Sequence, residues 1–192
     1  MNSQREVIAM LRSRNRSRGF SLVEILMAMV ILSVGLLAII GMIVSASLTA
    51  NSNKVDTTAA MLADTVMEQI SAKDVTSAGT FTIKDCAGVD HTVGLTAGAA
   101  PAGNGAPLNG APQYEVNYQA AAVANYQMNF ATCGANGTVN TFDVRWNIMN
   151  MSPAMPAQSA AYTRVVTVSA RQLTVKGVFS PPVTLRTVAG TL

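Results

Sequence analysis

The chain has 192 residues and a formal net charge of +3, and its charged fraction of 12% is low for a soluble enzyme. Residues 1–19 hold five Arg and one Glu, a net charge of +4, so residues 20–192 are left with −1. A basic surface for nucleic acid is therefore not predicted, and the length allows one small domain beside a long helix.

The N-terminal segment is basic and is followed by an apolar run, residues 25–44, that contains no charged side chain. As a helix rising about 1.5 Å per residue, this run spans about 30 Å, the thickness of the hydrocarbon core of a bilayer. Five arginines precede it: Arg5, Arg12, Arg14, Arg16 and Arg18. They predict that the N-terminal end stays in the cytoplasm while the rest of the chain crosses the membrane. Because Ala46 and Ala50 follow the run, composition alone also allows an ordinary secretory signal peptide.

The sequence GFSLVE stands between the arginines and the apolar run, at residues 19–24. It resembles the prepilin cleavage and methylation motif of type IV pilins and of type II secretion pseudopilins. The resemblance implies that prepilin peptidase cuts after Gly19, that Phe20 becomes the N-methylated terminus, and that Glu24 guides docking into a filament. The implied partners are prepilin peptidase, other major and minor pilins, the inner-membrane pilus assembly platform and the membrane itself.

Glu24 is also a functional candidate on physical grounds, because a carboxylate inside the membrane costs roughly 2.5–3.5 kcal/mol and needs a partner. The terminal ammonium of a neighbouring Phe20 would neutralise it and set the axial register of a filament. Two alternatives remain on the residues alone. Glu24 could pair with the ammonium of its own chain, four residues away, or its side chain could extend to the lipid headgroups.

A finer resemblance points to PilV-type minor pilins, the type IV pilus modification proteins. It rests on the sequence SVGLL at residues 33–37, on Ala63 with Asp64, and on Glu68. Many major pilins carry a proline in the second half of the apolar span, whereas this chain has none before Pro101. The resemblance implies an inner-membrane protein with a periplasmic C-terminal domain, found on the pilus and cell surface after assembly. A minor pseudopilin and a signal-anchored enzyme or binding protein are the alternatives.

Residues 45–73 contain no proline or glycine, and their apolar side chains recur at helical spacing. The predicted apolar face consists of Leu48, Val55, Ala59, Leu62, Val66 and Ile70. The sequence therefore predicts one helix over about residues 20–73, in which residues 20–44 serve the membrane and assembly and residues 45–73 are amphipathic. A membrane anchor followed by a separate coiled-coil helix is the alternative.

The sequence pattern of residues 74–192 predicts a β-rich extracytoplasmic domain. The candidate strands are 80–84, 91–95, 114–119, 125–130, 138–148, 162–171, 173–179 and 183–188. In 138–148 the residues Phe142, Val144, Trp146 and Ile148 face one way, and Thr141, Asp143, Arg145 and Asn147 the other. Residues 96–113 and 149–160 are predicted loops, and they are the candidates for any adhesive ligand. The expected fold class is α+β, with an antiparallel sheet packed on the stripe at residues 55–70.

Cys86 and Cys133 both fall on the extracytoplasmic side, where an oxidising compartment favours a disulfide. Such a bond would contribute about 4 kcal/mol in the chain-entropy model; two separate buried thiols are the alternative. His91 is the only histidine and is expected to be a solvated strand residue. Because no nucleotide-binding motif, metal-ligand cluster or catalytic constellation is found, we predict no catalytic residue, no metal, no cofactor and no enzymatic activity.

Overall fold

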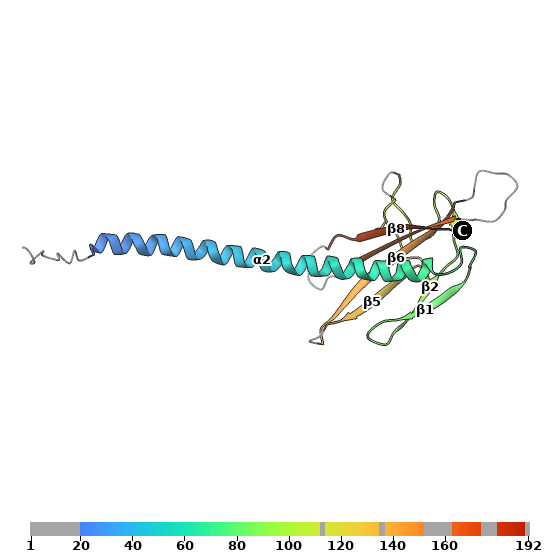
Figure 1. The fold of residues 1–192 in the computed structure, drawn as a ribbon, viewed down its shortest axis with the longest axis horizontal. Coiled ribbons are helices and arrows are strands. Elements are labelled where there is room, and N and C mark those ends of the chain that lie inside the picture. The colour runs from blue at the N-terminus through green and yellow to red at the C-terminus, as the bar shows by residue number, and fades with distance from the viewer. Residues whose placement is uncertain (1–19, 112–113, 135–136, 152–162, 174–179, 191–192) are drawn as a thin grey trace, which may run out of the picture. The chain divides into compact units, whose positions relative to one another are not determined.

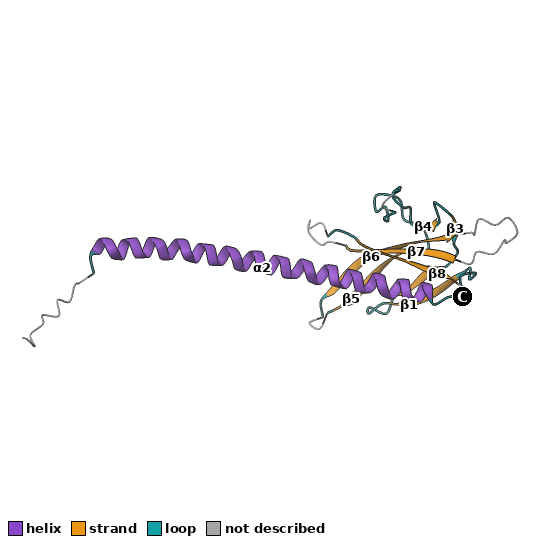
Figure 2. Cartoon of the chain, turned by 45° about the horizontal axis from the view of Figure 1, so that its top comes forward, coloured by secondary structure: helices purple, strands orange, loops and turns teal. Residues whose placement is uncertain are grey.

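The computed structural model describes residues 20–111, 114–134, 137–151, 163–173 and 180–190 (Figure 1). Three predicted segments lie outside these ranges: the leader at 1–19 that cleavage after Gly19 would remove, residues 152–160 of the predicted loop at 149–160, and residues 174–179 of a predicted strand. The chain separates into two compact units, Met1–Leu48 and Thr49–Leu192, and each is described by itself. A long N-terminal helix and a helix-covered sheet, antiparallel except for one short strand, confirm the predicted α+β class (Figure 2).

Helix α2 runs without a break over Leu22–Ser71, which excludes the alternative of two separate helices. It begins as the Ser21 carbonyl accepts from the N–H groups of Glu24 and Ile25. The acid of Glu24 in the first turn suits the positive end of the helix dipole. Farther along, the Thr57, Thr58 and Thr65 hydroxyls donate to carbonyls four residues earlier, so these polar groups are satisfied inside the helix.

The sheet of the second unit is built around its longest strand, β6, at Val139–Met151. Beside β6 on one side lies β7 (Thr163–Gln172), followed by β8 (Val183–Gly190) at the edge. On the other side β6 pairs antiparallel with β5 (Gln127–Cys133) and β4 (Asn104–Gly105), and parallel with β3 (Gly98–Ala99). A separate antiparallel hairpin joins β1 (Thr80–Lys84) to β2 (Asp90–Gly94).

The core lies between the second half of α2 and one face of this sheet. The helix contributes Ala59, Leu62, Ala63, Val66 and Ile70, and the sheet contributes Phe142, Val144, Trp146, Ile148, Val166 and Val168. The indole N–H of Trp146 donates to the Gly94 carbonyl at 3.1 Å, so the largest core side chain leaves no unpaired donor. The predicted stripe is right from Ala59 to Ile70, and Val55 is partly buried. Leu48, on the same predicted apolar face but outside the stretch expected to meet the sheet, is 66% exposed and belongs to the first unit.

The opposite face of β6 is also buried, which the alternating pattern did not predict. Asp143, Arg145 and Asn147 are all buried. The Asn147 amide donates to the carbonyls of Ala102 and Ala106, and it thereby holds the Gly- and Ala-rich segment against the sheet. The prediction of an open loop at 96–113 is therefore wrong in part, because β3 and β4 form there. The predicted strand at 114–119 is wrong too: it makes one isolated bridge, from Val116 to Leu108.

Arg164 of β7 closes the C-terminal end of α2. Its side chain is 0% exposed. Its guanidinium donates to the carbonyls of Lys73 at 2.7 Å and Asp74 at 3.2 Å, and also to that of Ile70. The last turn of α2 has no basic residue of its own, so a strand distant in sequence supplies the cation that suits this end of the dipole. Burial lowers the pKa of Arg164 from its ordinary value, and the nearby Asp74 opposes that shift.

We expect Arg164→Met to lower the free energy of unfolding by about 3 kcal/mol, because the carbonyls at the end of α2 and just beyond it lose a buried donor. Chemical denaturation in detergent micelles, followed by the near-ultraviolet dichroism of Trp146, measures this. Arg186→Met is the matched control: Arg186 is exposed, with its guanidinium 5.0 Å from the centre of the Tyr114 ring. Its loss should cost less than about 1 kcal/mol. Equal losses for the two variants would contradict the capping role.

Candidate functional site

The first half of α2 presents apolar side chains on its whole circumference. Every residue from 20 to 54 is exposed, with Phe20 at 77% and Ile31 at 69%. The most apolar 18-residue window of the helix has a mean hydropathy of 2.8, so by length and composition α2 is able to cross a membrane. An apolar surface of this extent marks a site of interaction with lipid or protein.

Glu24 is the acid within this surface. It lies one turn beyond Phe20, and Phe20, Glu24, Ile25, Ala28, Met29 and Leu32 line a shallow hollow along one side of the helix. Among the residues that the structure describes, Glu24 makes no ion pair. Gly19 lies outside the described ranges. The nitrogen of Phe20 is an amide in the full chain, and it becomes an ammonium only if the bond after Gly19 is cut.

Comparison with protein families finds the prokaryotic N-terminal methylation motif at residues 14–40. The match indicates a type IV pilin-like or pseudopilin precursor. It also implies processing by prepilin peptidase. The matched residues cover the end of the basic segment and the first part of α2, and the motif favours a structural protein over an enzyme. No curated protein and no solved structure matched the chain.

The structure joins Cys86 to Cys133 by a disulfide, in agreement with the expected pairing. Cys86 lies in the turn between β1 and β2, and Cys133 ends β5, so the bond ties the β1–β2 hairpin to the six-stranded sheet. Both residues are exposed, and the alternative of two separate buried thiols does not hold.

A buried carboxylate strengthens the same junction. Asp85 lies 3.0 Å from Nε2 of His91 and also accepts from the N–H groups of Val89 and Ala131. The His91 hydrogen bond is the main reason that the pKa of Asp85 is lowered to about 2, and burial opposes it. The prediction of a solvated His91 was wrong: its side chain is 12% exposed, and its ring packs against Phe130.

In the described part of the chain, no group of three or more His, Cys, Asp or Glu side chains is placed to hold a metal ion. Sequence reasoning missed the charged cluster of Asp143, Arg145 and Arg171 on the outer face of the sheet. A signal was present: Asp143 and Arg145 are opposite charges two residues apart, and so they share one face of a strand.

The low pKa of Asp85 predicts a pH dependence of stability. The group is about pKa 3.9 in an unfolded chain and about 2 here, so its contribution is complete above about pH 5 and is lost as the pH falls through about 2. Asp85→Asn should therefore destabilise the protein at pH 7, and the difference from wild type should shrink towards pH 2.

Denaturant midpoints measured from pH 7 down to pH 2 test this expectation. Asp90→Asn is the control, because Asp90 is exposed and lies 3.6 Å from the Lys84 ammonium, a pair that contributes little. If the gap between wild type and Asp85→Asn stays constant over this range, the carboxylate does not have the assigned role.

Proposed function

We propose that the chain is a minor pilin, a structural subunit that is incorporated into a type IV pilus or primes its assembly. Prepilin peptidase cuts between Gly19 and Phe20, and Phe20 is then N-methylated. One observation carries the proposal: the methylation motif at 14–40 runs directly into a helix whose surface is apolar on all sides and exposed. Because this surface is exposed along residues 20–54, it requires an apolar environment such as lipid or other helices.

Two environments can cover a helix whose whole surface is apolar: lipid and the helices of other subunits. Lipid accepts it before assembly, because the hydrocarbon core matches its length and composition. In that state the N-terminus lies in the cytoplasm and the β domain in the periplasm, where the Cys86–Cys133 disulfide is stable. Packing against helices of other pilins replaces lipid afterwards, and the subunit then lies on the pilus at the cell surface.

Glu24 makes the packing between pilin helices specific. An isolated carboxylate is costly in an apolar medium, and so is an isolated ammonium. Cleavage creates such an ammonium at Phe20. A neighbouring subunit that places its Phe20 nitrogen beside Glu24 neutralises both charges, whereas a shift along the helix axis separates them. The pair thus favours one register between subunits.

Support for a minor pilin of the type IV pilus comes from the likeness of residues 33–37, 63–64 and 68 to PilV-type chains. The helix has no proline, unlike many major pilins. The candidate alternative is a minor pseudopilin of a type II secretion system, which would use the same helix. The two functions are separated by which filament contains the protein.

Mass spectrometry of sheared surface pili tests the proposal. The expected N-terminal peptide begins with N-methyl-phenylalanine followed by Ser-Leu-Val-Glu, because the peptidase removes residues 1–19. Recovery of a chain that begins after Ala46 or Ala50 would identify an ordinary signal peptide instead. Recovery in a secretion pseudopilus and not in pili would establish the pseudopilin.

In the same preparation Glu24→Gln tests the role of the charge. The variant keeps the size of the side chain, so cleavage should persist while the amount in pili falls about tenfold, which corresponds to 1.4 kcal/mol. Glu68→Gln is the control, because Glu68 is an exposed acid in the second half of α2. Wild-type incorporation of Glu24→Gln would refute the pairing without affecting the assignment of the cleavage site.

A further inference from the structure

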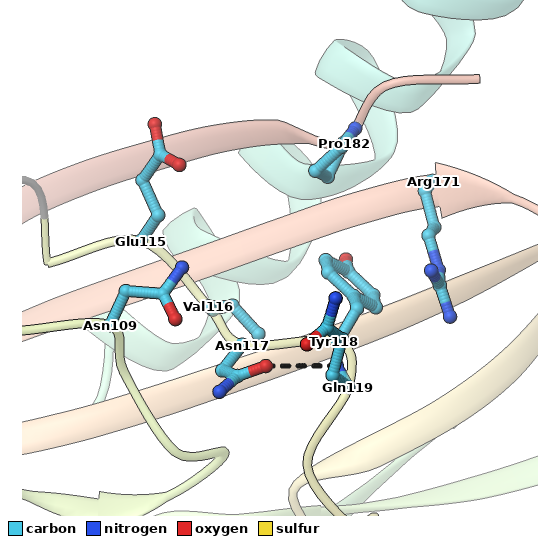
Figure 3. A pocket seen from close by; sticks show the side chains of 8 residues that line it. All are labelled: Asn109, Glu115, Val116, Asn117, Tyr118, Gln119, Arg171 and Pro182. Atoms are coloured by element: carbon cyan, nitrogen blue, oxygen red, sulfur yellow. Dashed lines mark hydrogen bonds between the residues drawn. The ribbon is translucent and has the colours of Figure 1, made fainter. Parts of the chain in front are cut away.

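A hollow of about 310 Å³ lies on the face of the sheet that the core helix does not cover. It is lined by Asn109 and residues 115–119, most of them polar, by Arg171 of β7, and by Pro182 just before β8. In Figure 3, Asn109 and Glu115 stand at one end, Arg171 at the other, and the turns of α2 appear behind the strands. Its volume is at the lower end of the range of about 300–1,000 Å³ for ligand sites, which suits a ligand of one small ring.

The Arg171 end of the hollow carries an excess of positive charge. The Asp143 carboxylate accepts from both Arg145, at 3.0 Å, and Arg171, at 3.2 Å, so two guanidinium groups share one negative charge. The side chains of Asp143 and Arg145 are 2% and 8% exposed, whereas that of Arg171 is 26% exposed. The excess positive charge is therefore exposed to solvent at Arg171.

Tyr118 fixes the position of that charge. The guanidinium of Arg171 lies 4.1 Å, and that of Arg145 4.9 Å, from the centre of its ring. The Tyr118 hydroxyl donates to the Asp143 carbonyl. Burial is the main reason that the pKa of Tyr118 is raised to about 12, so the phenol stays neutral and does not balance the arginines. Arg171 is thus held in place for an anionic group.

Asn117 and Asn109 supply amide donors elsewhere in the lining of the hollow. Oδ1 of Asn117 accepts from the N–H group of Gln119, at 2.9 Å (Figure 3), and from that of Ala120, at 3.3 Å. These bonds fix the side chain, and its Nδ2 keeps two donors that no other described residue takes up. The Asn109 side chain is exposed at the other end. Glu115 beside it offers acceptors for hydroxyl groups, and it would repel a doubly charged phosphate.

We propose that this hollow binds a sugar acid, a polyhydroxylated ring that carries one carboxylate. The carboxylate pairs with Arg171, the hydroxyl groups bind to Asn117, Asn109 and Glu115, and Pro182 contacts the apolar face of the ring. This binding does not depend on cleavage or filament assembly. The ligand is a free sugar acid or the terminal unit of a glycan, since both present the same groups.

Saturation-transfer NMR on the full chain tests the proposal, in micelles of a detergent without a sugar headgroup. The probes are glucuronate, methyl glucuronide and glucose. We expect glucuronate to bind with a dissociation constant on the order of 1 mM and glucose to bind about tenfold more weakly, because it lacks the charge. Methyl glucuronide separates the two sources of ligand: equal binding indicates the end of a glycan, and lost binding indicates the free acid.

Asn117→Asp is the informative variant, because it keeps the Oδ1 acceptor of the turn and replaces the two donors with a repelling oxygen. Its affinity for glucuronate should fall about tenfold with unchanged near-ultraviolet dichroism. Asn109→Asp, at an exposed position, provides a second test that does not disturb the fold. Asn53→Asp on α2 is the matched control and should bind as wild type does. Wild-type affinity in both pocket variants, equal binding of glucose, or no binding at about 10 mM glucuronate would overturn the proposal.

Discussion

The structure depends on one constraint: helix α2 carries two apolar surfaces, and the chain covers one of them. Residues from Ala59 to Ile70 pack into the core with Trp146 and its neighbours. Residues 20–54 are exposed all round. Full burial of a large apolar side chain stabilises by roughly 1.5–3 kcal/mol, so a row of such side chains in water is strongly unfavourable. Lipid or other helices must therefore complete the molecule, and the methylation motif at 14–40 indicates which family of assemblies uses such a helix.

The second unit is stabilised by contacts that connect segments distant in sequence. Arg164 joins the central sheet to the end of α2, and the Cys86–Cys133 disulfide joins the β1–β2 hairpin to β5. On the outer face of the sheet, Asp143 and its two arginines lie beneath the segment that carries Tyr118. These contacts hold the sheet against the second half of α2, and they build a polar hollow on the sheet face away from that half.

Local pattern was sufficient to predict the features that repeat along the chain. Helical spacing predicted α2 to within two residues at each end, and alternation predicted most of β6 and β7. The errors arose where polar side chains reach across the sequence. His91 is covered because Asp85 binds it, and the segment after Ala97 folds onto the sheet because Asn147 binds carbonyls 41 and 45 residues away. Such pairings leave no periodic signal, and a Gly- and Ala-rich segment has few side chains that could reveal its burial.

The most direct test of the central claim is a photo-crosslinking residue placed in the apolar half of α2. Leu32 is 64% exposed and belongs to the surface that requires a partner, whereas Leu62 is 8% exposed and lies in the core of its own domain. In sheared pili, a crosslinker at position 32 should join the protein to another pilus subunit, and one at position 62 should react within the chain. A protein that reaches the pilus fraction but forms no intermolecular crosslink from position 32 would contradict the account.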